Sequence, residues 1–346
     1  MDRLAIVILN WNGCGMLRRY LPTLERCSAM EGVSIVVADN NSTDGSMEMM
    51  RAEFPAIRLI QLDDNYGFAG GYNMALKQVG SEYYLLLNSD VEVTDGWLEP
   101  MLEYMDIHPE VAACQPKIRD FKKPEMFEYA GAAGGYMDKW GYMFCRGRIF
   151  DCVEKDEGQY DDVRSVFWAT GAALLVRSRD FWNAGGLDER FFAHQEEIDL
   201  CWRLRSRGRG IVCIPESTVF HVGGATLNKS NPYKTFLNFR NNLLMLYKNL
   251  PENRLRRVMF VRFWLDMLAM LMFVVKLNMK DAGAVLRARR EFRRLKPAFA
   301  QSRRENLAAS TVTDIPECAD FSILWKYHIG GKRRFSDIGE LTDYKN

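Results

Sequence analysis

Residues that could bind a cation or a diphosphate follow several stretches of this chain that are typical of buried strands. The apolar run 83–87 ends in Asn88-Ser89-Asp90, which places Asp90 at the carboxyl end of a predicted strand. Ligands of open α/β sheets bind outside such strand ends. A carboxylate there can hold a hard divalent cation, with substrate phosphates as further ligands. Such triplets are also common as ordinary exits from a strand, so the interpretation depends on other segments converging on the same place.

Two earlier predicted strands also end in polar clusters. The first exits into residues 10–12 (NWN), and the second exits into residues 39–45 (DNNSTDG). Ser42 or Asp44 could simply cap the following helix. Asp39 comes too early in the segment to act as a cap. Its carboxylate can accept a hydrogen bond from the imide N–H of a pyrimidine base.

The segment 65–73 (NYGFAGGYN) lies just before and within a third predicted helix. Its glycines would let the backbone approach a phosphate or a sugar at a helix start, although for this segment alone a tight turn is the better explanation. The segment is not the G-x-G-x-x-G dinucleotide fingerprint, and the chain contains no P-loop sequence.

Acidic residues precede a later predicted helix, and a histidine closes a later predicted strand. Glu196 and Glu197 lie in the first turn of the helix, where acids suit the macrodipole. The functional interpretation is a carboxylate base above a pocket. Asp199 and Arg203 are four residues apart and could simply pair. His221, which precedes two glycines, is a candidate metal ligand, although a lone histidine is more often structural.

Bulk composition excludes several classes of protein. The chain has 346 residues, of which 48% are hydrophobic and 26% charged, and this is typical of a globular protein. A net charge of +1 argues against nucleic-acid binding. The eight cysteines form no C-x-x-C pair and are expected to be reduced thiols of a cytosolic protein. The first predicted strand starts at residue 4, so we expect no signal peptide.

Strand-like and helix-like segments alternate over the first 115 residues, which predicts a parallel sheet with helices on both faces. The Gly-rich and aromatic segment 119–165 predicts an irregular insertion with a hairpin near the open face of the sheet. A strand at 172–176, a helix near 195–207, two short strands at 211–214 and 218–221, and a helix at 233–249 are predicted to follow.

The C-terminal hundred residues differ in character from the rest of the chain. Residues 258–279 are strongly apolar, but the uninterrupted apolar run covers only 267–275, short of the roughly 20 residues that a spanning helix needs. Residues 287–304 hold eight basic residues and one acid. We expect a catalytic domain over 1–250 and a helical, basic extension over 251–346. Its segment 255–304 would contact a membrane surface, or would form an oligomer interface or a cap on the catalytic domain.

Seven stretches, taken together and in order, resemble glycosyltransferase family 2, the inverting nucleotide-sugar transferases, and within it the bacterial rhamnosyltransferase-like members. The resemblance covers residues 4 to about 245, and its stretches are VILNWN, VVADNNSTDGS, DNYGFAGGYNMAL, YYLLLNSD, ATGAALLVRS, GGLDERFFAHQEEIDLCWRLR and VFHVGGAT. It implies the A-type fold, a Rossmann-like α/β fold with a mainly parallel central sheet flanked by helices.

The resemblance also implies a role for each matched position. Asp90 and His221 would bind a divalent cation, Mn²⁺ or Mg²⁺, and Asn88 replaces the first acid of the D-x-D motif. Glu197 would be the catalytic base, with Glu196 as its rival, and Glu197 replaces a commoner aspartate. The residues assigned to the nucleotide and its diphosphate are Asn10, Trp11, Asn12, Asp39, Asn41, Asn65, Gly67, Asn73, Ser89 and Arg240.

The implied reaction is a single displacement that moves a sugar from a nucleoside-diphosphate donor to a glycan or polyprenyl-linked acceptor. The family likeness makes dTDP-rhamnose a plausible donor. A lipid-linked acceptor would place the enzyme in the cytoplasm at the inner face of the plasma membrane, in the synthesis of cell-surface polysaccharide. The alternative is a catalytically inactive scaffold that binds nucleotide sugars; the four retained residues Asp39, Asp90, Glu197 and His221 argue against it.

Overall fold

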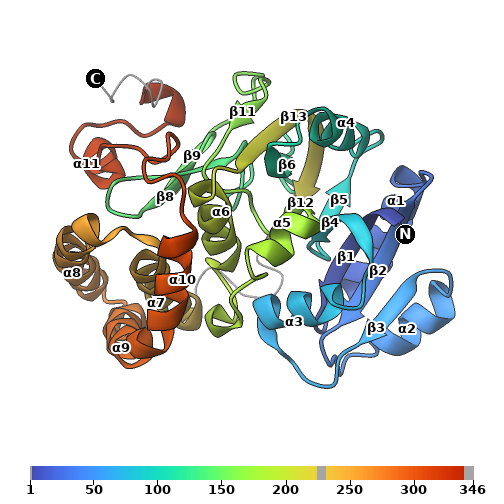
Figure 1. Cartoon of the computed structure of the whole chain (residues 1–346), viewed down its shortest axis with the longest axis horizontal. Coiled ribbons are helices and arrows are strands. Elements are labelled where there is room, and N and C mark those ends of the chain that lie inside the picture. The colour runs from blue at the N-terminus through green and yellow to red at the C-terminus, as the bar shows by residue number, and fades with distance from the viewer. Residues whose placement is uncertain (1, 224–230, 339–346) are drawn as a thin grey trace.

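The computed structural model describes residues 2–223 and 231–338, and within them a nine-stranded sheet forms the centre of the molecule (Figure 1). A second, four-stranded antiparallel sheet lies beside it. The strands are β1 (Asp2–Asn10), β2 (Val33–Asp39), β3 (Arg58–Gln61), β4 (Ser81–Leu87), β5 (Val91–Val93), β6 (Val111–Asp120), β7 (Gly135–Met137), β8 (Met143–Cys145), β9 (Arg148–Ile149), β10 (Cys152–Val153), β11 (Arg164–Ser165), β12 (Ala173–Arg177) and β13 (Gly210–His221).

The helices of the first 250 residues follow the predicted alternation of strands and helices, except that α5 was not predicted. They are α1 (Cys14–Cys27), α2 (Ser46–Glu53), α3 (Gly67–Leu76), α4 (Glu99–Ile107), α5 (Ser178–Asn183), α6 (Glu196–Ser206) and α7 (Pro232–Asn249). The later helices are α8 (Glu252–Val275), α9 (Met279–Leu295), α10 (Ala300–Ala309) and α11 (Ile323–His328), with short 3₁₀ turns η1 (Glu189–Phe191), η2 (Lys296–Phe299) and η3 (Phe335–Asp337).

The central sheet is mixed, and its parallel half carries the N-terminal strands. Its order is β11-β13-β6-β12-β4-β1-β2-β3, with β5 paired to β13. The neighbours β4, β1, β2 and β3 are parallel, whereas β12 runs antiparallel between β4 and β6. The parallel register brings Asn10 opposite Asp39. The polar residues that follow these strands therefore emerge at one edge.

Both faces of this sheet are buried, which explains why its strands are continuous apolar runs rather than alternating ones. In β1, Ala5 and Val7 face one hydrophobic cluster, and Leu4, Ile6 and Ile8 face the other. Side chains from α1, α2 and α4 cover the second face, and side chains from α3, α5, α6 and α7 cover the first.

Two expectations for the middle of the chain need correction. The segment 119–165 is more regular than predicted, because β6 extends to Asp120 and four short strands form the second sheet. Local composition does not predict these strands, because each is only two or three residues long and forms only by pairing with a neighbouring strand. The two strands predicted at 211–214 and 218–221 are a single strand, β13, whose pairing with β6 shifts register between Ile214 and Thr218.

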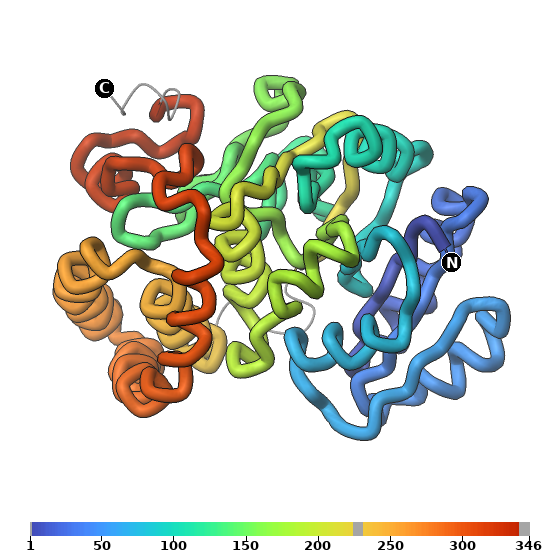
Figure 2. Tube along the Cα trace, viewed as in Figure 1, coloured from blue at the N-terminus to red at the C-terminus, as the bar shows by residue number. Residues whose placement is uncertain are grey.

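The C-terminal helices continue the core of the catalytic region. Leu255 and Val258 of α8, Phe292 of α9 and Phe299 belong to the same hydrophobic cluster as the inner face of α6 and α7. Figure 2 shows α8 and α9 side by side at the edge of the molecule farthest from the N-terminal strands. The proposed boundary near residue 250 falls at the Leu250-Pro251 junction between α7 and α8.

The length of α8 differs from the sequence expectation. Its 24 residues are long and apolar enough to cross a membrane, by length and composition alone. Only 17% of its most apolar 18-residue stretch is buried inside the protein. The expectation counted Arg262 and Asp266 as interruptions of the apolar run. Both side chains instead face the protein, where Arg262 pairs with Asp266 at 3.2 Å and Arg289 of α9 pairs with the same carboxylate.

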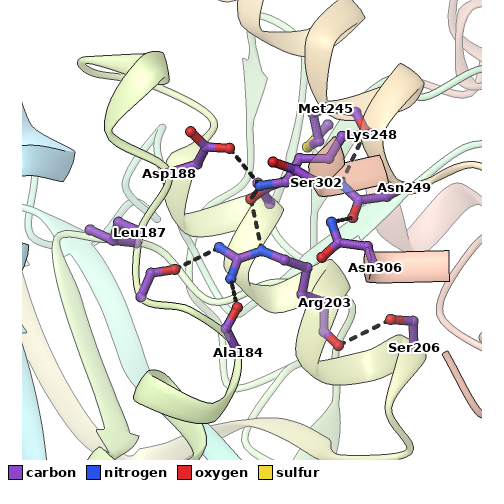
Figure 3. Close-up of polar contacts among 12 residues, drawn as sticks. Ala184, Leu187, Asp188, Arg203, Ser206, Met245, Lys248, Asn249, Ser302 and Asn306 are labelled. Atoms are coloured by element: carbon purple, nitrogen blue, oxygen red, sulfur yellow. Dashed lines mark hydrogen bonds and ion pairs between the residues drawn. The ribbon is translucent and has the colours of Figure 1, made fainter. Parts of the chain in front are cut away.

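A buried network of charged groups fastens α6 to α7 (Figure 3). The fully buried Asp199 carboxylate accepts hydrogen bonds from Arg203 at 2.9 Å, Lys248 at 2.8 Å and Asn249 at 2.8 Å. Lys248 also pairs with Asp188 at 2.8 Å. The expected Asp199–Arg203 pair is therefore present, as part of a larger network.

We expect Asp199→Ala to lower the free energy of unfolding by roughly 3–5 kcal/mol, because it leaves two buried cations without their shared partner. Urea unfolding followed by circular dichroism and tryptophan fluorescence measures the change, and coincident curves would show two-state behaviour. Arg18→Ala, which breaks the exposed pair with Glu53, is the matched control and should leave the midpoint nearly unchanged. Equal shifts in the two variants would contradict this role of the network.

Candidate active site

The carboxyl ends of β1 and β2 form a polar corner with one unsatisfied acceptor. The Nδ2 group of Asn10 donates to Asp39 Oδ1 at 2.9 Å and to Ser42 Oγ at 3.1 Å. Asn10 and Asp39 are almost fully buried, and Asn10 Oδ1 has no hydrogen-bond partner within the described residues. A Cβ atom on Gly13 would lie 2.5 Å from that oxygen, so only glycine fits there. The corner thus offers an open acceptor beside a fixed carboxylate, as recognition of a base N–H requires.

The residues around this corner are exposed to different degrees. Trp11 is 46% exposed, and Asn12 and Asn41 are exposed with positive φ angles of 52° and 62°. Asn12 Oδ1 accepts the backbone N–H of Thr43 at 2.8 Å, which links the loops after β1 and β2. Trp11 is therefore free to stack on a planar ligand, whereas Asn12 is used to join the two loops.

The predicted metal ligands are in contact with each other. His221 Nε2, at the end of β13, lies 3.1 Å from Asp90 Oδ1. His221 Nδ1 lies 3.4 Å from Glu128 Oε1, a residue of the insertion. All three side chains are nearly buried. The structure therefore places the imidazole between two carboxylates that come from distant parts of the sequence.

These neighbours change the ionisation of His221 and Asp90. Burial disfavours the imidazolium, but the hydrogen bond with Asp90 and the Glu128 carboxylate outweigh it and raise the pKa of His221 to about 10. Burial likewise disfavours the ionised form of Asp90, yet the hydrogen bond and charge of His221 lower the pKa of Asp90. The carboxylates of Asp90 and Glu128 hold negative charge, which a proton on His221 or a bound cation can balance.

The donor set fits a divalent cation that takes nitrogen and oxygen ligands, such as Mn²⁺. Asp90 and His221 would be its protein ligands, and Glu128 would orient the imidazole through the other ring nitrogen, as second carboxylates often do. Across residues 2–223 and 231–338 no group of three or more His, Cys, Asp or Glu side chains is arranged to hold a metal ion by itself, and this includes the Asp90, His221 and Glu128 set. Two protein ligands leave room for phosphate oxygens and water.

The loop at the start of α3 is fixed mainly by its own contacts. Asn65 Oδ1 accepts from Asn40 Nδ2 at 3.0 Å and from the N–H of Gly67 at 2.9 Å. Gly67 has φ +68°, and a Cβ atom there would lie 2.5 Å from the ring of Phe192. Asn73 is turned toward the segment before α6, where its side chain contacts the backbone of Leu187. In these contacts Asn65, Gly67 and Asn73 act as structural residues, and their nucleotide contacts remain predictions.

The start of α3 is capped by a carbonyl group rather than left open. The N–H groups of Phe68 and Ala69 donate to the Phe192 carbonyl at 2.7 and 3.2 Å. A phosphate at this helix start would compete with that carbonyl. Phe192, His194 and Gln195 have φ angles of 65°, 70° and 75°, a concentration of left-handed backbone in non-glycine residues that is costly.

Side chains of α7 hold this strained loop in place. Asn241 Nδ2 lies within 3.0 Å of the carbonyl oxygens of Phe191, Ala193 and His194. Arg240, predicted to bind the diphosphate, is buried and donates from Nη2 to Phe191 at 2.9 Å. Asn242 donates to Gln195 Oε1 at 3.2 Å. The NFRNN sequence therefore positions the loop that leads into α6.

The two candidate bases begin α6 directly after the strained loop. Glu196 is 3% exposed, and burial together with the adjacent Glu197 raises the pKa of Glu196 well above its usual range. Burial raises the pKa of the Glu197 carboxyl to about 7, although nearby backbone N–H groups oppose the shift. One carboxylate oxygen of each residue has no hydrogen-bond partner in the described chain.

Backbone contacts place Glu197 at the same sheet edge as Asp90. A Cβ atom on Gly171 would lie 3.7 Å from the Cβ of Glu197. The next residue, Ala172, accepts the N–H of Asn88 at 3.0 Å, two residues before Asp90. The candidate base, the metal pair and the Asn10–Asp39 corner therefore lie along one edge of the central sheet. Ser89 also belongs to this edge, 3.5 Å from a Cβ built on Gly13.

Three positioning residues escaped the sequence analysis: Glu128, Asn40 and Asn241. Glu128 lies in the least regular segment, and nothing local relates it to His221, 93 positions away. Asn40 lies in the stretch VVADNNSTDGS and Asn241 directly follows Arg240, but a single sequence cannot distinguish ligand contacts from loop contacts. Positions 224–226, the end of the VFHVGGAT stretch, lie outside the described residues.

Glu128→Gln should weaken Mn²⁺ binding about 10–100-fold, because the loss of the carboxylate charge leaves the imidazole poorly oriented and less basic. Isothermal titration of Mn²⁺ in the presence of a nucleoside diphosphate measures the affinity. Glu125→Gln, an exposed change in the same insertion, is the control. An unchanged Mn²⁺ affinity in Glu128→Gln would show that Glu128 only closes the fold.

The chain is similar in sequence and in fold to several known proteins. The model of the family described as Glycosyl transferase family 2 matches residues 5–148. The N-acetylglucosaminyl-diphospho-decaprenol L-rhamnosyltransferase of Mycobacterium tuberculosis (strain CDC 1551 / Oshkosh) is 29% identical over 238 residues, which cover 64% of this chain and 76% of that protein. Rhamnosyltransferase WbbL of Escherichia coli (strain K12) is 26% identical over 163 residues, 45% of this chain and 61% of WbbL.

A solved structure shares the fold at much lower identity. GalNAc-T7 with UDP, GalNAc and Mn²⁺ superposes with a TM-score of 0.55 at 12% identity, and the match covers 72% of this chain and 48% of that one. The predicted family and the predicted fold are thereby confirmed. Residues 5–148 form a glycosyltransferase family 2 domain, the fold is of the A type, and the chain is a glycosyltransferase.

Proposed function

We propose that the enzyme transfers a sugar from a nucleoside diphosphate to a hydroxyl acceptor by a single displacement with inversion. The observation that supports this most strongly is the arrangement at the sheet edge. The Glu197 carboxyl, whose pKa is raised to about 7, and the buried Asp90–His221 pair both lie along this edge. One base and no second nucleophile are what a single displacement needs.

Glu197 is the proposed base, and the electrostatics favour it over Glu196. Burial and the adjacent Glu197 raise the pKa of Glu196 well above its ordinary value, which favours the protonated form of that carboxyl group. Glu197, with a pKa of about 7, is ionised in part at neutral pH and is a stronger base than an ordinary glutamate. It would take the acceptor hydroxyl proton as the oxygen attacks the anomeric carbon.

Asp90 and His221 are the proposed ligands of a divalent cation, which when bound would neutralise charge on the departing diphosphate. Asn10 and Asp39 are proposed to bind the base, and Trp11 is exposed enough to stack on it. Ser89 lies beside them. Roles of Asn12, Asn41, Asn65, Gly67, Asn73 and Arg240 in nucleotide binding are weaker proposals, since Asn12, Asn65, Gly67, Asn73 and Arg240 already have structural roles.

Two relatives named as rhamnosyltransferases support dTDP-rhamnose as the proposed donor. The relative named for N-acetylglucosaminyl-diphospho-decaprenol supports a lipid-linked glycan as the proposed acceptor. We infer action at the cytoplasmic face of the membrane in the assembly of a surface polysaccharide.

A thermal-shift screen with nucleotide sugars, with and without Mn²⁺, tests the donor. The expected result is the largest stabilisation with dTDP-rhamnose and Mn²⁺, because a ligand that binds only the folded state raises the melting temperature. A larger shift with another nucleotide sugar would replace dTDP-rhamnose. Stabilisation without any turnover across a panel of lipid-linked acceptors would instead support the inactive scaffold.

Glu197→Gln should retain donor affinity and lower the transfer rate about 10²–10⁴-fold, the usual contribution of a general base. The amide keeps the size of the side chain but cannot accept the proton. Donor affinity is measured by titration and transfer by release of the nucleoside diphosphate. Glu196→Gln is the matched control, because the neutral amide resembles the protonated acid. A larger loss in Glu196→Gln would exchange the two roles.

The pH profile should carry the signature of Glu197. Since the base works only when deprotonated and its pKa is about 7, kcat/KM should rise through about pH 7 and level off above it. Steady-state rates from about pH 6 to about pH 8 in constant ionic strength measure this. A profile that is already flat at pH 6 would mean that the base titrates as an ordinary carboxylate.

A further inference from the structure

The helix α8 presents its apolar side to solvent and its charges to the protein. Large apolar side chains recur at positions 260, 264, 268, 271 and 275, spacings of three and four that form one stripe along the helix. Trp264 is 59% exposed and Val275 is 74% exposed. Leu277, just after the helix, is 86% exposed. So large a contiguous apolar surface marks an interaction site.

The opposite side of α8 explains why this surface is uninterrupted. Arg262 and Asp266 are almost fully buried, and Asp266 is shared with Arg289 of α9. Arg262 also donates to Asn242 Oδ1 on α7 and to the carbonyl of Trp140. The only two charged residues in the middle of the helix are therefore paired inside the protein, and the outward stripe carries no charge.

Exposed basic residues lie at the end of the stripe and along the outer side of α9, which packs beside α8 (Figure 1). Lys276 and Lys280 follow the apolar stripe directly. The other exposed basic residues of α9 and of the 3₁₀ turn after it are Arg287, Arg290, Arg293, Arg294 and Lys296.

Acidic groups do not balance this charge. On α8 and α9, Asp266 and Asp281 are buried, Glu291 pairs with Arg294, and Glu252 pairs with Arg303. An apolar stripe next to unbalanced positive charge is complementary to an anionic lipid surface, where acyl chains lie directly beneath acidic headgroups.

We propose that the α8–α9 face, defined by the stripe at positions 260–275 and the basic side of α9, docks the enzyme on an anionic bilayer with α8 lying along the surface. A span is disfavoured, because moving α8 into the bilayer would break the ion pair between Asp266 and Arg289 of α9 and carry the charged side chains of Arg262 and Asp266 into hydrocarbon. Trp264 suits the interface, where indole rings are enriched.

The docking face is joined rigidly to the catalytic edge. Arg262 of α8 donates to Asn242, and Asn242 donates to Gln195 in the strained loop before Glu197. A bilayer held against α8 would therefore hold the catalytic edge at a fixed distance and orientation from the membrane. This placement suits an acceptor whose lipid stays in the bilayer.

Flotation with vesicles tests the docking face on the full chain. The wild type should float with phosphatidylcholine vesicles that contain phosphatidylglycerol and stay below with phosphatidylcholine alone. The pair Leu268→Glu and Leu271→Glu, and separately the pair Arg287→Glu and Arg290→Glu, should each reduce the bound fraction about tenfold or more. The matched controls are Ile107→Glu, an exposed apolar residue on α4, and the pair Lys122→Glu and Lys332→Glu; both should float like the wild type.

Three results would overturn the proposal. Equal flotation with neutral vesicles would remove the anionic surface as the partner. Bound protein that resists both high salt and carbonate would indicate a span. A dimer in sedimentation that the Leu268→Glu and Leu271→Glu pair dissociates, without any flotation of the wild type, would assign the face to a second copy of this chain. The assay needs no sugar transfer, so its failure is distinct from failure of the proposed reaction.

Discussion

The site depends on one buried contact, the imidazole of His221 held between the carboxylates of Asp90 and Glu128. A charge in a low-dielectric interior is stable only when it is paired, so the three side chains fix one another. They come from the end of β4, the end of β13 and the insertion between β6 and β7. Their pairing therefore also fixes the insertion against the sheet edge where the Asn10–Asp39 corner and the proposed base Glu197 are found. The irregular segment is part of the site because it supplies the outer carboxylate.

A second constraint acts on the base. Glu197 follows a loop with three non-glycine residues in left-handed conformations, and such strain persists only where the surroundings enforce it. Asn241 and Arg240 supply hydrogen bonds from α7 to the carbonyl groups of this loop, and the loop in turn caps α3 through Phe192. The position of the proposed base Glu197 is thus set by side chains of α7. This explains why α7 is joined so firmly to α6 through the buried Asp199 network.

The C-terminal helices take part in the same framework. The hydrogen bonds that run from Arg262 through Asn242 to Gln195 make the outermost helix a support for the catalytic loop. Because the charged side chains in the middle of α8 form these internal contacts, its outward side is apolar. The internal structural role of α8 and its proposed membrane role therefore follow from the same distribution of residues.

The sequence alone determined the main alternation of strands and helices over the first 115 residues, the family resemblance, and the positions of Asp39, Asp90 and His221 at or just after strand ends. These follow from local periodicity and from turn chemistry, which a single chain displays directly. It could not determine that 119–165 forms a second sheet, since strands of two or three residues exist only through pairing. The sequence also gave no sign that Glu128 contacts His221, or that Arg262 and Asp266 turn inward. Those outcomes depend on which distant segments share a buried charge, and only the folded chain decides that, because the energy of burial is set by partners that are remote in sequence.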